Sequence, residues 1–253
     1  MPNDGDSPMI QHWNPRRHMA GFSVGILCID SHHPLIPGNM QHAASYSFAP
    51  LYGVVRGVDP ARLFAGDAAL AMPIVAAARE LVDQGARALV GACGSFAHFQ
   101  AQVRAAVEVP VCLSVLVQVP FLVSLLPEMQ RLLVYFAARR AYTPALQAAC
   151  GITAAIHDRL VVEEAWSLPA FAAILDRQPR LDASALEAQV TRHLAEVVER
   201  DPDIGGIVLQ CSDLPPFSAA IQRATGRPVY DGVLVAEWLR SAVERRPYVP
   251  SER

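Results

Sequence analysis

Two cysteines, Cys93 and Cys211, stand in matching surroundings and are the residues best suited to do chemistry in this sequence. Each ends a short apolar stretch that predicts a strand, and each precedes a helical pattern. At a helix N-terminus, unpaired backbone N–H groups and the helix dipole favour a thiolate. A thiolate and a thiol on opposite sides of a carbon beside a carboxylate remove a proton from one face and return one to the other. The pair therefore predicts acid–base chemistry at such a carbon.

The two cysteines also share a position in an internal repeat. A Phe follows each cysteine by six residues, and a Pro-Val pair follows each by seventeen, at Pro110-Val111 and Pro228-Val229. Two alternatives remain: any two βαβ units share apolar spacing, and a cysteine at a strand end is often a small buried residue. These alternatives account less easily for the common register of the cysteine and the Pro-Val pair than for the apolar positions. We infer a duplication that brings both sulfurs to one cleft.

Apolar stretches alternate with helical patterns, which predicts βαβ units and an α/β fold with mainly parallel sheets. In such sheets ligands bind beyond the carboxyl ends of the strands, where both cysteines stand. We predict strands at 24–29, 88–93, 111–114, 132–136, 206–211 and 229–231. We predict helices at 68–84, 96–107, 143–150, 183–200, 216–225 and 234–245.

The composition bounds the class of partner. The chain has 253 residues, 52% of them hydrophobic, which is enough to bury a full core. Its formal net charge of −3 gives no electrostatic reason to expect binding to nucleic acid or to an anionic membrane. We therefore expect a small-molecule partner. The apolar stretch 109–127 is broken by Pro110, Gln118 and Pro120, which favours a buried strand and helix over a membrane span. Residues 1–20 are polar and without the apolar core of a signal peptide, and we expect a flexible tail there.

Five cysteines without CxxC spacing argue against a disulfide framework and against a structural zinc site, so we expect no metal. Reduced thiols in a cytoplasmic protein are the expected state. The remaining three, Cys28, Cys112 and Cys150, are expected to be buried. No GxGxxG or P-loop pattern appears, so the sequence does not support nucleotide binding.

Several motifs resemble those of the aspartate/glutamate racemase superfamily, which includes amino-acid and hydantoin racemases, maleate isomerases and arylmalonate decarboxylases. The resemblance extends from about Gly21 to the last predicted helix. Its most specific motif is the segment from Cys211 to Pro216. The other matching pieces are the loop Pro37-Gly38-Asn39, the turn Cys93-Gly94-Ser95-Phe96, Ser114 at a strand end, and the run from Thr225 to Val229.

The resemblance implies an enzyme without a cofactor, built of two similar Rossmann-like halves with the active site between them. The first half would comprise residues 21–117 with 229–253, and the second residues 118–228. Cys93 and Cys211 would be the two proton-transfer residues. In many relatives an acidic residue precedes the second cysteine, whereas this chain has Gln210. The implied substrate-binding residues are Pro37, Gly38, Asn39, Gly94, Ser95, Ser114, Ser212 and Asp213.

We therefore expect a racemase or epimerase of an amino acid or a related α-substituted carboxylate. The alternatives are a maleate-type cis–trans isomerase, a malonate-type decarboxylase and a carboxylate-binding protein without catalysis. The oligomeric state stays open, and a homo-oligomer is compatible with the sequence. Other polar residues either line the cleft or are solvated: His32, His33 and His42 near the Pro-Gly loop, His98 in the helix after Cys93, and the pair Arg139 and Arg140.

Overall fold

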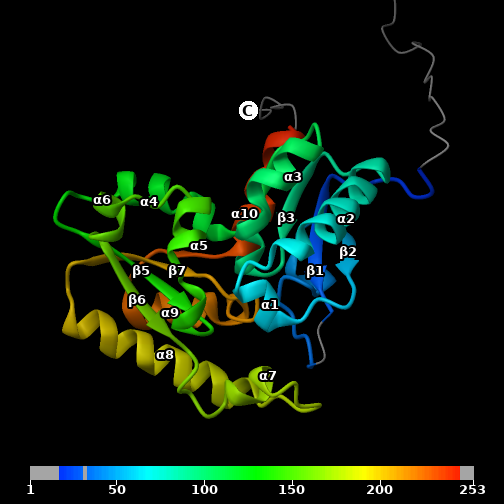
Figure 1. Cartoon of the computed structure of the whole chain (residues 1–253). Coiled ribbons are helices and arrows are strands. Elements are labelled where there is room, and N and C mark those ends of the chain that lie inside the picture. Colours follow the sequence, from blue (N-terminus) through cyan, green and yellow to red (C-terminus); the bar gives the residue numbers. More distant parts are fainter. Residues whose placement is uncertain (1–16, 31–32, 246–253) are drawn as a thin grey trace, which may run out of the picture.

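Two parallel sheets of four strands each form the centre of the molecule (Figure 1). The computed structural model describes residues 17–30 and 33–245. The strand orders are β2-β1-β3-β4 and β6-β5-β7-β8. This confirms the predicted α/β class. The strands are β1 Val24–Ile29, β2 Leu51–Val55, β3 Ala88–Gly91, β4 Val111–Cys112, β5 Arg131–Phe136, β6 Leu160–Glu164, β7 Ile204–Leu209 and β8 Val229–Tyr230.

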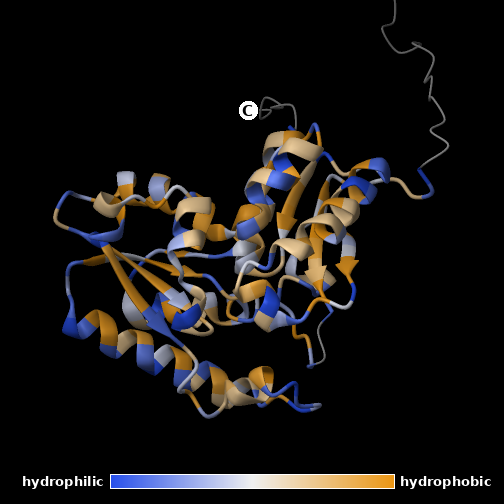
Figure 2. Ribbon diagram, in the orientation of Figure 1, coloured by the Kyte–Doolittle hydropathy of each residue, from blue (hydrophilic) through white to orange (hydrophobic). Residues whose placement is uncertain are grey.

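Helices cover the sheets, and short 3-10 turns lead into several of them. The long helix α8 has buried leucines and valines on one face and charged side chains on the other, which produces the alternating colours along it in Figure 2. The helices are α1 Pro60–Phe64, α2 Ala71–Asp83, α3 Gln100–Ala106, α4 Val119–Leu125, α5 Pro144–Ala149, α6 Ala154–His157, α7 Ala172–Leu175, α8 Ala183–Arg200, α9 Ser218–Thr225 and α10 Gly232–Val243. The 3-10 turns used below are η3 Gly94–Phe99, η4 Val115–Gln118, η5 Arg139–Ala141 and η6 Pro215–Phe217.

The two sheets repeat one another in register as well as in strand order. Leu89 pairs with Val111 between β3 and β4, and Ile207 pairs with Val229 between β7 and β8. These pairs are related by the same sequence offset that separates Cys93 from Cys211. The helices α3 and α9 also begin at equivalent positions. The repeated unit of strand, turn, helix and strand is thus present in three dimensions.

One hydrophobic cluster joins the two halves. It combines side chains of β1 and β3 with side chains of β5 and of helices α4 and α10. Helix α10 comes last in the chain, yet it packs on β3 and β1 of the first sheet. The chain therefore crosses from the second half back to the first just before its last helix, and the carboxyl ends of both sheets are held close to a common space.

The structure corrects several predicted boundaries. Strands 88–93 and 206–211 end two residues earlier, so both cysteines stand in turns after their strands. The strand at 229–230 belongs to the second sheet, which places the return crossing after Tyr230. The sequence did not predict β2 and β6, because these edge strands mix buried and exposed positions and lack a regular apolar pattern.

The apolar stretch 109–127 contains β4, η4 and α4, as a buried strand followed by a helix. Among the described residues, no helix is long and apolar enough to cross a membrane. The expected tail at residues 1–20 lies mostly outside the described residues.

Candidate active site

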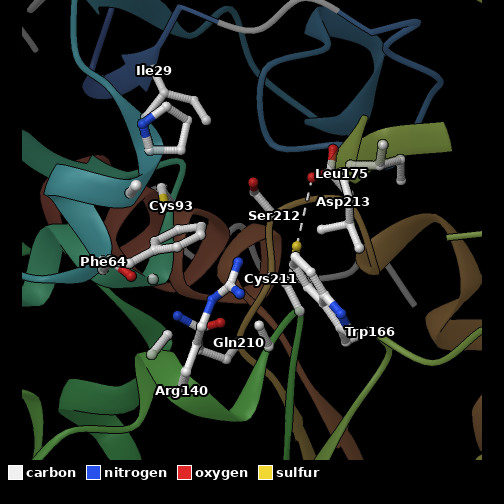
Figure 3. A pocket seen from close by; sticks show the side chains of 18 of the residues that line it. Ile29, Phe64, Cys93, Arg140, Trp166, Leu175, Gln210, Cys211, Ser212 and Asp213 are labelled. Carbon is white, nitrogen blue, oxygen red and sulfur yellow. Dashed lines mark hydrogen bonds between the residues drawn. The ribbon is translucent and has the colours of Figure 1, made fainter. Parts of the chain in front are cut away.

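A cavity of about 720 Å³ lies at the carboxyl ends of the strands, and residues of both halves line it. Cys93 and Cys211 both face this cavity, and in Figure 3 their side chains point into it from different elements. The structure thus brings to one pocket two thiols that lie far apart in the sequence. Gly94, Ser95, Ser212 and Asp213 also line it.

Cys93 sits between β3 and the 3-10 turn η3, where it takes an extended conformation as the N-cap. Because η3 packs against α5, the Cys93 turn is held at the junction between the halves. Burial raises the pKa of the Cys93 thiol to about 11, although the backbone N–H and the hydroxyl of Ser95 favour the thiolate and pull the value down. The Ser95 hydroxyl is buried and makes no hydrogen bond of standard geometry with a described residue, so it can donate to a ligand or to the sulfur.

Cys211 has a different electrostatic environment. Its Sγ donates a hydrogen bond to Oδ2 of Asp213 at 3.5 Å, drawn as the dashed line in Figure 3. Burial and the charge of Asp213 together raise the pKa of the Cys211 thiol well above its usual range. The Cys93 sulfur is close enough to raise that pKa further. At neutral pH Cys211 is therefore a thiol that can donate a proton.

Asp213 is the centre of a buried polar group that joins the halves. Its Oδ1 lies 2.8 Å from Nε2 of His33 and accepts a hydrogen bond from Nδ2 of Asn39 at 2.5 Å. Burial by itself lowers the pKa of His33, but the hydrogen bond and the charge of Asp213 raise it above the ordinary value overall. His33 also lines the cavity, so the Cys211 thiol is linked through the Asp213 carboxylate to an imidazole.

Gln210 provides a second contact between the two cysteine turns. It is buried, lines the cavity and directly precedes Cys211. A Cβ atom added to Gly94 would collide with the Gln210 side-chain amide, so only glycine leaves room for this contact. The amide therefore lies between the two cysteine turns. The sequence marked Gln210 only as a departure from relatives; nothing in its pattern indicated the contact with Gly94.

Four of the implied substrate-binding residues do not line the cavity. Pro37 is exposed in a turn, and Gly38, at φ +98°, packs against the backbone of Pro216. Asn39 acts through its hydrogen bond to Asp213. Ser114 caps the 3-10 turn η4 by accepting a hydrogen bond from the N–H of Leu116. In this structure their roles are to hold loops and turns that support the pocket.

The histidines weighed from the sequence are placed differently. His33 lines the cavity, and His32 lies outside the described residues. His42 caps the short turn at Ala43–Ser45, away from the pocket lining. His98 packs against Gly66, and burial lowers its pKa. Of the three that the structure describes, only His33 lines the cavity together with the two cysteines.

The second half contributes further pocket residues, of which the sequence had indicated Arg140 as a candidate but not the others. Trp166 and the segment around α7, which includes Phe171, Ile174 and Leu175, line the cavity with apolar surface. Arg140 and Arg177 add guanidinium groups, and the first half adds the carboxylates of Asp30 and Asp59. Among the described residues, no group of three or more His, Cys, Asp or Glu side chains is arranged to hold a metal ion.

Several solved enzyme structures share this fold. Allantoin racemase from Klebsiella pneumoniae matches with a TM-score of 0.58 at 19% identity, over 87% of this chain and 88% of that one. An arylmalonate decarboxylase matches with a TM-score of 0.55 at 17% identity, over 87% and 92%. Glutamate racemase from Bacillus anthracis matches with a TM-score of 0.53 at 17% identity, over 87% and 81%. The chain has the fold of the aspartate/glutamate racemase superfamily.

Sequence comparison adds relatives with another activity. Dimethylsulfoniopropionate lyase 7 of Emiliania huxleyi is 25% identical over 234 residues, which cover 89% of this chain and 68% of the lyase. The lyase of Durusdinium sp. clade D is 26% identical over 247 residues, covering 94% and 77%. The chain spans 61% of Emiliania lyases 3 and 6. No family model matches the chain.

All of these relatives are enzymes, but their reactions differ. The fold neighbours are racemases and a decarboxylase, whereas the curated sequence relatives carry the name of a lyase. The expectation of superfamily membership agrees with the fold. The narrower expectation of a racemase is not confirmed, because the sequence relatives are named for a different activity.

Proposed function

We propose that this protein is a lyase that removes a proton beside a carboxylate and expels a leaving group from the next carbon. Dimethylsulfoniopropionate is the first candidate substrate. The observation that carries the proposal is the pairing of two buried thiols in one cavity whose charged side chains differ between the halves. Asp30 and Asp59 come from the first half, and Arg140 and Arg177 from the second.

This distribution of charge suits a zwitterion. Dimethylsulfoniopropionate carries a carboxylate and a sulfonium cation separated by two carbons. Guanidinium groups favour the carboxylate, and carboxylate and aromatic side chains favour a cation. Asp213 is already bound to His33 and Asn39, and Asp59 Oδ1 caps helix α1 at the N–H of Ala61. Asp30 and the second oxygen of Asp59 are therefore the carboxylate groups better placed to face the cationic end. The named activity of the curated relatives supports the same substrate.

Cys93 is the better base of the two. The N–H and hydroxyl of Ser95 stabilise its thiolate, whereas Cys211 gives its proton to a hydrogen bond with Asp213. In the proposed reaction the Cys93 thiolate takes a proton from Cα, and the electron pair of that C–H bond forms the Cα=Cβ double bond. The Cβ–S bond breaks, and its electrons leave with the sulfur as neutral dimethyl sulfide. Acrylate and one proton, held on Cys93 and then released, complete the balance.

The test is to incubate the full chain with dimethylsulfoniopropionate and measure dimethyl sulfide in the headspace and acrylate by NMR. We expect equal amounts of both products. Cys93→Ser should release neither above background, and Cys150→Ser, which changes a buried thiol outside the pocket lining, should retain activity. Absence of both products with the unmodified chain over a wide substrate range would refute this substrate.

Racemisation is the second candidate, because both thiols face one cavity as a two-base reaction requires, and racemases share the fold. Aspartate, glutamate, hydantoins and allantoin in heavy water would reveal it. Incorporation of deuterium at the α-carbon with loss of optical rotation, and without dimethyl sulfide release, would favour a racemase over a lyase. Fumarate from maleate, or carbon dioxide from substituted malonates, would instead select the isomerase or decarboxylase alternatives.

A further inference from the structure

Two neighbouring arginines on the turn after β5 take different directions. The backbone N–H of Arg139 binds the Glu164 carboxylate, and its guanidinium donates to the carbonyl of Val162 on β6. Arg140 instead lines the cavity. Its guanidinium carbon lies 4.1 Å from the centre of the Trp166 ring. The sequence alone could not show which of these two side chains faces a pocket, because adjacent arginines are expected to be a solvated basic pair.

Stacking on Trp166 gives Arg140 a defined orientation. Trp166 is 41% exposed and lines the same cavity. A guanidinium lying over an aromatic face keeps the N–H groups on its edge free to donate. In Figure 3 the Arg140 side chain points into the cavity that Cys93 and Cys211 also line. A planar donor is therefore held at the cavity that both sulfurs line.

We propose that Arg140, oriented by Trp166, binds the substrate carboxylate and restricts the enzyme to anionic or zwitterionic carboxylic acids. This inference rests on the proposed function and names the group that would recognise its substrate. A guanidinium and a carboxylate form two parallel charge-assisted hydrogen bonds, which fix the orientation of the carboxylate as well as adding affinity. The carbon beside the bound carboxylate then lies in the space between the two sulfurs.

The same arrangement determines how a zwitterionic substrate is oriented in the cavity. One face of the Trp166 ring is covered by Arg140, so a substrate cation cannot occupy that face. Repulsion from the guanidinium also directs the cation away from Arg140. The carboxylates of Asp30 and Asp59, from the first half, are the remaining attractive groups for it. Arg140 would thus act as a specificity-determining residue that orients the substrate across the pocket.

Direct binding separates this inference from catalysis. We would titrate the full chain with propionate, which keeps the carboxylate but lacks a leaving group, and with neutral propionamide, by calorimetry. Arg140→Gln should weaken propionate binding about 10- to 100-fold, since it removes a charge-assisted bidentate pair. Propionamide binding should change little. Arg140→Lys should bind propionate more tightly than Arg140→Gln but less tightly than the unmodified chain, because lysine restores the positive charge but not the planar pair of N–H donors.

Arg139→Gln is the matched control, because it removes the same charge one residue away and outside the cavity lining. It should leave propionate affinity within about twofold, as expected when only long-range charge changes. Trp166→Leu should lie between the control and Arg140→Gln, since it removes the orienting ring but keeps the charge. Circular dichroism would establish that each variant is folded.

Equal propionate affinity for Arg140→Gln and the unmodified chain would overturn the inference. So would an equal loss in Arg139→Gln, or no measurable propionate binding to the unmodified chain. If propionate binding depends on Arg140 while no dimethyl sulfide is released, the inference stands and the elimination proposal alone fails. If turnover is observed, Arg140→Gln should raise KM more than it lowers kcat, because the lost contact is made in the ground state as well.

Discussion

The turns at Cys93 and Cys211 have the same backbone plan but different electrostatics. Each follows a central parallel strand, leads through a 3-10 turn into a helix, and faces one cavity. At Cys93 the Ser95 hydroxyl and N–H favour the thiolate. At Cys211 the carboxylate of Asp213 accepts a hydrogen bond from the thiol and is itself bound by His33. Duplication therefore supplies two sulfurs with raised pKa values, and the neighbouring polar groups differ: Ser95 favours the Cys93 thiolate, whereas Asp213 favours the Cys211 thiol.

The largest expected effect comes from replacing one sulfur at a time. Cys93→Ser should lower dimethyl sulfide release about 10²- to 10⁴-fold, the range typical of a lost general base. Cys211→Ser should lower it about tenfold or less, because dimethyl sulfide leaves without a proton. In a racemisation assay both variants should lose activity equally, since each face of the carbon needs its own group. Initial rates of both reactions would measure this.

A larger loss for Cys211→Ser than for Cys93→Ser in the lyase assay would reverse the assignment of the base. Equal and complete losses would indicate that β-elimination also uses both sulfurs. Cys150→Ser serves as the control for replacement of a buried thiol away from the pocket lining.

The pH profile should show the raised thiol pKa values directly. Burial raises the pKa of Cys93 to about 11, so below that pH the thiolate fraction and the rate should rise about tenfold per pH unit. The charge of Asp213 raises the pKa of both cysteines, and Asp213→Asn should move the alkaline limb to lower pH. Initial rates from pH 7 to 10, with thiolate absorbance near 240 nm, would measure both effects. An unchanged limb in Asp213→Asn would contradict this electrostatic account.

A smaller effect concerns the contact that joins the two turns. Gly94→Ala introduces a Cβ into the Gln210 amide and should displace it, lowering kcat/KM about tenfold, as a misplaced pocket group does. Adding Gln210→Ala removes the collision, so the double variant should recover activity relative to Gly94→Ala alone. Comparison of kcat/KM for the three variants measures the coupling. Simple additivity of the two substitutions would argue that the contact does not position the site.

The smallest effect is on stability through His33. Because Asp213 raises the His33 pKa above its ordinary value of 6.5, the charged imidazole stabilises the fold. That contribution is fully present below 6.5 and is lost as pH rises through the higher folded value. His33→Gln should therefore lower Tm more at pH 6 than at pH 8, by less than about 2 °C. In an Asp213→Asn background the difference should vanish; if it persists, another group is titrating.

The sequence determined the α/β class, the repeated strand–turn–helix unit and the two thiols, because these depend on local periodicity and on residue type. The two strands before the cysteines were predicted two residues too long, since apolar side chains continue past the last ladder hydrogen bond into the turns, whereas the strand ends at Ile29 and Phe136 were correct. The edge strands β2 and β6 escaped prediction because one side of each is partly exposed. Arg139 and Arg140 were indistinguishable, because the direction of an exposed side chain depends on what packs beside it.

Only the tertiary structure decided how the two sulfurs differ. The Asp213 carboxylate meets His33 and Asn39 across more than 170 positions of sequence, and no local pattern predicts such a contact. The same holds for Gln210 against Gly94 and for Arg140 over Trp166. The chemistry available to a thiol is set by residue type, whereas its pKa and its partners depend on which distant groups the packed sheets bring within hydrogen-bonding range.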